Sequence, residues 1–544
     1  MMKKLLVASG RNHSSPSLPV ATSSALLLPT AIIQPNTRIR KFHSSQAVSY
    51  GYQFKERTEL VREFIHDSLY NPEYGYFNKK DHELIITHPL LRDEKLTNTA
   101  SIENDQFEND LINNNLSFDE QMILPFHELQ DQLDYLENLS ELYQRGPQSW
   151  GTPIEIFQPY YGIAIAEYML RTTYGEGKNE NLDKPLKIYE MGGGMGTCAR
   201  NVLDYLEKEY PEVYKRTEYN IIEISSQLHE QQKIRCARHV RNGKLKLFHA
   251  SFMDWANIEQ DECFVIAMEV LDNCAHDKVS IDGQGNVLEC HVFEDSITNY
   301  YGEVFLPCQD ELIIRYLYLS GIIEESTPNS SNTAISSQYF YKSIEDLRGG
   351  KIKKAIRSFF SKSVGGMRSL LMSSIGGDHV MFIPTVQLQI IEKLQQNFPK
   401  HRLICADFDY LGTDEPGESN RPLVQKKFKF MKASNLLRKV REHGTIFLKK
   451  EDVTSEENFS VESHAFRSYL VPKGECDIFF ATDFATMQQV YGKVCKDGNG
   501  ALRGSKVVKS SQFMNQYAQK GKFDTKSGYN PLLRDYSNFS FFLS

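Results

Sequence analysis

Short hydrophobic runs alternate with amphipathic stretches throughout residues 184–272, more regularly than elsewhere in the chain. Each short run rich in apolar residues predicts a strand. The predicted strands are 186–190, 219–224, 245–249 and 263–268. The amphipathic stretches predict helices at 196–210 and 226–240. Strands that alternate with helices are typical of a parallel, doubly wound α/β sheet of the Rossmann type.

The pattern is less regular on both sides of this block. The predictions there are a helix at 54–70, an acidic loop insertion with some late helix at 93–137, a β-rich segment at 277–306, a basic helix at 352–373, a helix at 386–398 and a fifth core strand at 401–409. The predicted domain plan is therefore an N-terminal helical cap segment at 51–183 and a Rossmann-like domain at 184–544. Insertions around 277–400 interrupt the second domain.

The first 50 residues differ in composition from the rest of the chain. They contain no Asp or Glu, are rich in Ser, Thr and Ala, and carry the basic residues Lys3, Lys4, Arg11, Arg38, Arg40 and Lys41. This composition is typical of a mitochondrial transit peptide, which the membrane potential draws inward. The alternative is a disordered cytosolic tail. We expect a mitochondrial protein of the matrix.

The overall composition is that of a soluble globular protein, with 40% hydrophobic and 24% charged residues. The net charge of −8 gives no support to nucleic-acid binding, which needs a clustered basic surface. No stretch approaches the roughly 20 apolar residues of a membrane span. The nine cysteines include no CxxC pair, so we expect small buried side chains and neither a disulfide framework nor a metal site.

The sequence Glu-Met-Gly-Gly-Gly-Met-Gly at 190–196 lies between a predicted strand and a predicted helix. Gly192, Gly194 and Gly196 allow a sharp turn and a close approach to a ligand, and the helix start offers free amide groups. A carboxylate at Glu190 repels pyrophosphate but suits a cationic ammonium or sulfonium group. The loop is thus predicted to bind a positively charged, nucleoside-containing cofactor. The alternative is a tight turn without a ligand.

Three further residues are candidates for the same cofactor site. Glu223 ends the second predicted strand, where a carboxylate can accept hydrogen bonds from both hydroxyls of a ribose. Ser251 and Phe252 follow the third strand and are placed to border an adenine ring. Phe252 is a stacking candidate there, with a place in the hydrophobic core as its alternative.

The candidate catalytic residues are Glu269 and Asp272, which follow the fourth strand. The carboxyl ends of parallel strands face the ligand crevice, so these acids can meet a methyl acceptor. Carboxylates there would orient a cationic guanidinium through paired hydrogen bonds. The alternatives are a helix-capping Asp272 and a solvated Glu269.

The chain resembles the MidA-type methyltransferases, which include a mitochondrial complex I assembly factor that methylates arginine. The blocks that carry the resemblance are 69–77 (Leu-Tyr-Asn-Pro-Glu-Tyr-Gly-Tyr-Phe), 152–162, 190–196 with Glu223, and 269–272, with weaker similarity at 407–410 and 482–484. The resemblance implies a class I methyltransferase sheet, S-adenosylmethionine as cofactor and a protein arginine as substrate, in a complex I subunit. Met268 and Ala275 stand where the family usually has Asn and Pro.

Three functions remain open at this point. The first is an S-adenosylmethionine-dependent protein arginine methyltransferase. The second is a non-catalytic assembly chaperone that keeps the methyltransferase fold. The third, an NAD-dependent oxidoreductase, is disfavoured by the carboxylate of Glu190 beside the glycine loop.

Overall fold

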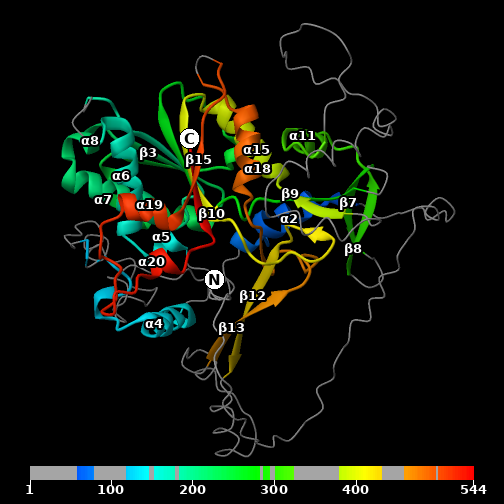
Figure 1. Ribbon diagram of the computed structural model, residues 1–544, viewed down its shortest axis with the longest axis horizontal. Coiled ribbons are helices and arrows are strands. Elements are labelled where there is room, and N and C mark those ends of the chain that lie inside the picture. Colours follow the sequence, from blue (N-terminus) through cyan, green and yellow to red (C-terminus); the bar gives the residue numbers. More distant parts are fainter. Residues whose placement is uncertain are drawn as a thin grey trace, which may run out of the picture.

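The computed structural model describes residues 58–78, 118–119, 121–145, 152–177, 183–281, 286–294, 300–323, 379–431, 459–497 and 500–544. The predicted transit peptide, the predicted helix at 352–373 and most of the predicted acidic insertion lie outside these residues. Within them the chain forms three sheets with helices packed around them (Figure 1).

The largest sheet has the strand order β15-β16-β10-β5-β2-β3-β4. Its strands are β2 (Lys187–Met191), β3 (Glu218–Glu223), β4 (Leu245–His249), β5 (Cys263–Met268), β10 (His401–Phe408), β15 (Lys506–Lys509) and β16 (Phe539–Leu543). The first five pair in parallel, whereas β16 is antiparallel to both β10 and β15. The predicted α/β fold class is confirmed, together with all five predicted core strands.

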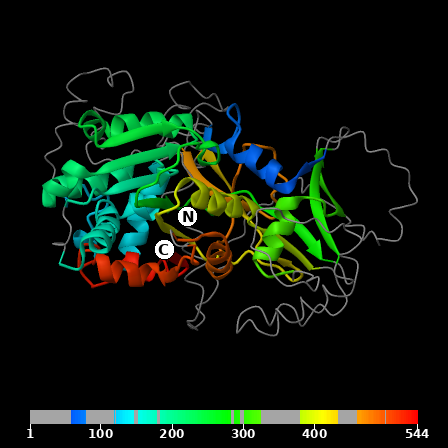
Figure 2. The same ribbon diagram turned by 90° about the horizontal axis from the view of Figure 1, so that it is seen from above.

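The sheet is covered by helices on both faces (Figure 2). Alternate residues of β5 separate two hydrophobic cores: Phe264 and Ile266 belong to one, and Val265 and Ala267 to the other. The first core includes α6 (Tyr160–Tyr174), α7 (Thr197–Glu209) and α19 (Ser510–Tyr517). The second includes α11 (Glu311–Leu319), α15 (Thr385–Asn397) and α18 (Phe484–Val494). A strand that is apolar on both sides therefore lies in the middle of a three-layer structure.

Two smaller sheets extend the central one. The first has the order β1-β7-β6-β9-β11, with β8 paired to β7. Its strands are β1 (Glu59–Leu60), β6 (Asp277–Ile281), β7 (Val287–Glu294), β8 (Tyr301–Pro307), β9 (His379–Ile383) and β11 (Glu418–Ser419). Strands β6, β7 and β8 confirm the predicted β-rich segment at 277–306. The second sheet, β12 (Leu423–Met431), β13 (Phe459–Phe466) and β14 (Asp477–Phe479), was not predicted; β12 and β13 extend away from the central sheet in Figure 1.

Other element boundaries differ from the prediction. The helix expected at 54–70 is shorter, because the chain pairs as β1 before α2 (Val61–Tyr70) begins. The helix expected at 226–240 is interrupted at Cys236, between α9 (Ser226–Arg235) and α10 (Ala237–Arg241). The remaining elements are α4 (Gln132–Arg145), α5 (Pro153–Ile156), α8 (Pro211–Arg216), α20 (Pro531–Arg534), η1 (Tyr76–Asn78), η4 (Phe126–Glu128) and η5 (Phe252–Asp254). The domain division at residue 183 stays a prediction.

All nine cysteines are buried, as expected, and each is a free thiol. The helices of the described segments are all too short or too polar to cross a bilayer.

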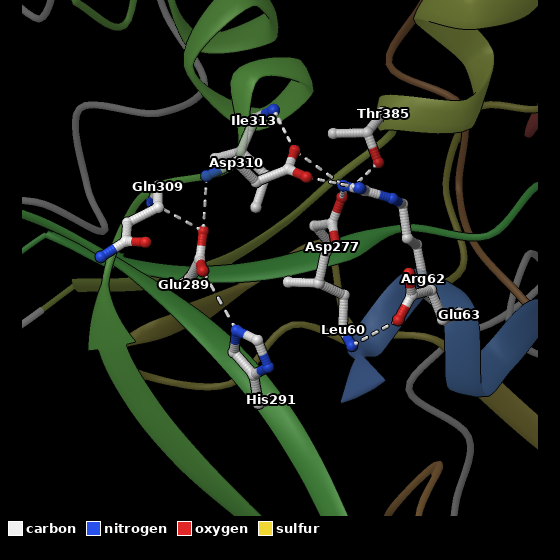
Figure 3. A network of polar contacts seen from close by, with 10 residues as sticks. All are labelled: Leu60, Arg62, Glu63, Asp277, Glu289, His291, Gln309, Asp310, Ile313 and Thr385. Carbon is white, nitrogen blue, oxygen red and sulfur yellow. Dashed lines mark hydrogen bonds and ion pairs between the residues drawn. The ribbon is translucent and has the colours of Figure 1, made fainter. Parts of the chain in front are cut away.

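A polar network attaches α2 to the neighbouring sheet and helices (Figure 3). Arg62 Nη1 donates to Asp277 Oδ2 at 2.7 Å and to Asp310 Oδ1 at 2.9 Å. Thr385 Oγ1 donates to Asp277 Oδ2 at 2.6 Å, and Asp310 accepts from the N–H of Ile313 as the cap of α11. Arg62 thereby links α2 to β6 and α11, and the shared Asp277 extends the network to α15. The network therefore holds the first turn of α2 against β6 and the start of α11.

Candidate functional site

The strand order reverses between β2 and β5, and ligands of doubly wound sheets bind at the carboxyl ends of the strands at such a point. Two sets of candidate residues flank it. We call Glu190, the loop at 192–196 and Glu223 the cofactor side. We call Glu269, Asp272 and the residues that contact them the acceptor side.

The glycine loop turns directly from β2 into α7. Gly194 and Gly196 have φ values of +52° and +82°, in the left-handed region that favours glycine. A Cβ at Gly196 would lie 2.8 Å from the sulfur of Cys236, so the loop packs closely there. A Cβ at Gly194 would meet nothing within 4 Å. The loop is therefore packed against the protein at one glycine and open at another, which leaves its backbone accessible to a ligand.

Glu190 is buried at the end of β2, with 3% of its surface exposed. Its Oε2 accepts a hydrogen bond of 2.9 Å from the hydroxyl of Tyr219. Burial raises the pKa of Glu190 to about 8; the Tyr219 bond opposes this shift and the charge of Glu223 adds to it. Burial therefore favours the protonated form of Glu190. A cation placed beside this group would favour the charged form.

Glu223 is joined to the glycine loop by hydrogen bonds. Its Oε1 accepts from the N–H of Ser225 at 2.9 Å, and its Oε2 accepts from Gln232 Nε2 at 3.3 Å. The same Gln232 nitrogen donates to the carbonyl of Gly194 at 2.8 Å. Burial raises the pKa of Glu223 to about 7, although these bonds favour its charged form. Glu190, the loop and Glu223 therefore lie close together.

Ser251 and Phe252 follow β4 and begin η5. The N–H of Ala250 donates to the carbonyl of Glu223 at 2.9 Å, which holds this turn next to the cofactor side. The Ser251 hydroxyl accepts from the N–H of Met253 as a helix cap. Phe252 is buried and nearly parallel to Phe398, with ring centroids 5.9 Å apart. One face of Phe252 is thus packed in the core, and the contact with adenine stays a prediction for both residues.

Glu269 stands directly after β5 and has a φ of +52°. The left-handed conformation costs a residue with a side chain about 1–2 kcal/mol. Its N–H donates to the carbonyl of Ala406 on β10 at 2.9 Å, so the conformation is held by the sheet. Backbone strain of this kind is concentrated at functional sites. Glu269 is half-buried, so the alternative of a solvated carboxylate stays open.

Asp272 is buried beside Asp407, the carboxylate near the end of β10. The Asp272 N–H donates to Asp407 Oδ2 at 2.9 Å, and the Asp272 carbonyl accepts from the N–H of Phe480 at 2.8 Å. The chain continues from Asp272 through a turn into β6, with no α-helix between them. The alternative in which Asp272 caps a helix is therefore wrong.

The N-terminal block at 69–77 crosses both sides of the site. The Tyr70 hydroxyl donates to the carbonyl of Asn273 at 3.2 Å, and the Ser225 hydroxyl donates to the carbonyl of Phe77 at 3.0 Å. Burial raises the pKa of Tyr70 well above its usual value, and the nearby negative groups, which include Asp272 and Glu223, raise it further. Tyr70 therefore lies between the acids of the two sides.

No role was predicted for Tyr70, Gln232 or Asp407. Tyr70 lies in a block quoted for its resemblance, but nothing in the sequence joins it to Asp272. A signal for Gln232 is present in the sequence. Its spacing of four residues from Leu228 places it on the inward face of α9, where an uncharged polar residue is unusual. Asp407 also had one, because it stands near the end of a predicted core strand.

A polar cluster elsewhere is built from Asp204, Glu207 and His239. Arg238 forms ion pairs with both Asp204 and Glu207, at 3.0 Å to Glu207, and His239 Nε2 lies 2.8 Å from Asp204. The arginine already supplies a positive charge to these acids. The cluster is therefore explained as an ion-pair network between α7 and α10.

Taken together, the doubly wound sheet, the glycine loop after β2 and the acid after β3 define a Rossmann-like site for an adenosine-containing cofactor. The chain belongs to the family described as "Putative S-adenosyl-L-methionine-dependent methyltransferase", whose model matches residues 164–498, more than half of the chain. S-adenosylmethionine is therefore its cofactor. This confirms the predicted cofactor and favours a methyltransferase over the NAD-dependent alternative.

Among curated proteins, the chain is similar to the protein arginine methyltransferase NDUFAF7 homolog, mitochondrial, of Schizosaccharomyces pombe, with 24% identity over 271 residues. The match covers 48% of this chain and 52% of the relative, so it spans about half of that protein. Among solved structures, two from Burkholderia thailandensis align with 90% of this chain. One, bound to S-adenosyl-homocysteine, has a TM-score of 0.46 at 11% identity and is covered over 88% of its length. The other, a native structure, has a TM-score of 0.42 at 10% identity and is covered over 87%.

Proposed function

We propose that this chain is a mitochondrial enzyme that transfers a methyl group from S-adenosylmethionine to an arginine side chain of a protein. The observation that carries the proposal is the pair Glu269 and Asp272, one strained and one buried, directly across the switch point from the glycine loop. The arginine methyltransferase activity in the name of the yeast relative supports the same acceptor.

The cofactor side has groups that fit S-adenosylmethionine. Glu223 would accept hydrogen bonds from the ribose hydroxyls, and the open side of Gly194 would admit the ligand next to the loop. Glu190 would stabilise the positive charge of the ammonium or sulfonium group. Ser251 and Phe252 would border the adenine.

On the acceptor side, the guanidinium of arginine would pair with the carboxylates of Glu269 and Asp272. When bound, S-adenosylmethionine supplies a methyl group on a sulfonium sulfur. Transfer would form an N–CH₃ bond at the arginine nitrogen and break the S–CH₃ bond, with its electron pair left on sulfur. The displaced N–H proton passes to Glu269 or Asp272. The two acids thus hold the nitrogen in line and accept its proton.

The location and the partner are further parts of the proposal. The composition of residues 1–50 supports import into the mitochondrial matrix, and the yeast relative is labelled mitochondrial. The resemblance to the MidA-type family supports a complex I subunit as the substrate, with a role in assembly of that complex.

The direct test compares respiratory-chain subunits from cells with the wild-type protein and cells with Asp272→Asn. We expect a methylated arginine in a complex I subunit that mass spectrometry detects only with the wild-type protein. The purified Asp272→Asn protein should still bind radiolabelled S-adenosylmethionine. Equal methylation of every subunit in both cell lines would contradict the proposal.

A non-catalytic assembly chaperone is the second candidate function. The departures at Met268 and Ala275 favour it, since both lie next to the acceptor acids and Ala275 is packed in a hydrophobic core with α2. The discriminating variant is Glu223→Ala, which should lose cofactor binding. If cells with this variant still assemble complex I, the chaperone is correct and the enzyme is not required.

A further inference from the structure

We propose that Gln232 is a positioning residue that holds the carboxylate of Glu223 and the carbonyl of Gly194 in the arrangement that receives the nucleoside. The inference rests on the proposed cofactor side and adds a residue to it. Gln232 is expected to touch neither the methyl group nor the acceptor.

Gln232 contacts both the carbonyl of Gly194 and the carboxylate of Glu223. The side chain is fully buried on α9, and its Nε2 donates to Gly194 O at 2.8 Å and to Glu223 Oε2 at 3.3 Å. A side-chain amide has two N–H donors, and both are used here. One residue therefore fixes the distance between two parts of the site that come from different βα units.

The same side chain supports the glycine loop by packing. A Cβ at Gly196 would lie 3.4 Å from Gln232 Cγ, and a Cβ at Gly193 would lie 3.4 Å from its Nε2. A leucine has similar size and would fill this position without any buried polar group. The amide is thus not needed for packing. Its hydrogen bonds explain why a polar residue stands at position 232. Within the described structure, its Oε1 is buried without a hydrogen-bond donor.

Gln232 also acts on the charge of Glu223. Glu190 on β2 and Tyr70 on α2 are titratable groups that interact with the charge of Glu223. Nearby, His249 on β4 contacts the carbonyl of Ile224 and stacks on His229 of α9. Burial and the negative charge of Glu190 oppose ionisation of Glu223, whereas the hydrogen bond from Gln232 favours it. Removing that donor should raise the pKa of Glu223 above about 7. The charged carboxylate is the stronger acceptor for the ribose hydroxyls, so the variant should bind better at higher pH.

The experiment measures the affinity of the full chain for S-adenosylmethionine by calorimetry at a series of pH values. We expect Gln232→Leu to weaken binding about ten-fold near neutral pH, with a loss that shrinks as pH rises. Gln231→Leu is the matched control, because Gln231 is the adjacent, partly exposed glutamine of α9. It should behave as the wild type at every pH.

A second variant keeps the proposal testable if Gln232→Leu folds poorly. Gln232→Glu keeps the size but places a second carboxylate against Glu223, so its affinity should fall as pH rises, opposite to the wild type. A loss that is equal at every pH in both variants would mean that Gln232 only supports the fold, and would overturn the inference. If Glu223→Gln binds as the wild type does, the proposed cofactor side itself is wrong. If Glu223→Gln fails to bind while Gln232→Leu is unchanged, only the inference fails.

Discussion

The cofactor side and the acceptor side lie at the same edge of one sheet but are assembled differently. The contacts that join Glu223 to the glycine loop are local: Gln232 and Glu223 are nine residues apart, and Gln232 and Gly194 are 38 apart. On the acceptor side, Asp272 contacts Asp407 across 135 residues, and Tyr70 contacts Asn273 across 203. Consecutive βα units are enough to form the first side. The second requires segments from four distant parts of the chain.

This difference suggests a division of roles. The cofactor is common to all members of the family, and a local structure suffices to bind it. The acceptor side is bordered by α2 and by the strands that the insertions contribute. Its specificity should therefore depend on how those insertions pack. The variants below separate the two sides.

The largest effect is expected for Gly194→Val. A valine at φ +52° is strained and would fill the open space beside the loop, so binding of S-adenosylmethionine should fall below detection. Gly243→Val is a matched control, because Gly243 has a φ of +67° and open space around it on an exposed turn. Calorimetric binding should be lost in the first variant and kept in the second, with a similar loss of stability in both. Equal binding would mean that the loop is a plain turn.

Asp272→Asn should affect only the acceptor side. We expect methyl transfer to fall about 100-fold, since proton acceptance and pairing with the guanidinium are both lost. The affinity for S-adenosylmethionine should stay unchanged. The control is Asp261→Asn, an exposed acid at the opposite end of β5. Kinetics with a methyl-accepting peptide test this, and a parallel loss of cofactor affinity would contradict the separation of the two sides.

Arg62→Met tests whether the network of Figure 3 supports the acceptor side from a distance. Arg62 pairs with the buried Asp277, so its removal leaves an uncompensated charge. We expect a loss of about 2 kcal/mol in the free energy of unfolding, discounted for the partial exposure of Arg62. Methyl transfer should weaken more than cofactor binding. Lys215→Met removes an exposed pair with Glu212 and should change neither quantity.

The smallest effect is a dependence on pH with opposite signs for binding and stability. Glu223 and Glu190 have pKa values of about 7 and about 8, against 4.5 for the ordinary side chain. Between the ordinary pKa of 4.5 and these raised values, the folded protein therefore binds more protons than the unfolded chain. The contribution of these two acids to the free energy of unfolding falls as the pH rises through that range. Cofactor affinity should rise over the upper part of that range, because the proposed roles of Glu190 and Glu223 use their charged forms. Titrations in two buffers of different ionisation enthalpy should detect the released proton; no release would contradict charged carboxylates in the complex.

The parts of the fold that the sequence predicted are those set by local periodicity. The strands from β2 to β5 and the helix α7 were expected within a few residues. The spacing of apolar residues in each segment follows the period of a strand or of a helix. The interruption of the helix at Cys236 was not expected. The sulfur of Cys236 packs on Gly196, and this contact is visible only in the folded structure. The antiparallel β16 was missed because its apolar sequence fits a buried strand of either direction.

The candidate site shows the same limit. Glycines and acids at strand ends could be named from the sequence, since parallel strands place their ends at one edge. The contacts of Tyr70 and Asp407 depend on tertiary packing and could not be predicted. The strain at Glu269 was also invisible in the sequence, because nothing in its neighbours requires a left-handed backbone.

The conformation of Glu269 has a consequence for the evolution and engineering of the enzyme. Replacing this residue with glycine would relax the backbone, so a screen for heat-resistant variants should favour that change. The same change would remove a carboxylate from the proposed acceptor side. Thermal tolerance and turnover are thus opposed at a single position, and a stabilised version of this protein would have to gain its resistance to heat elsewhere.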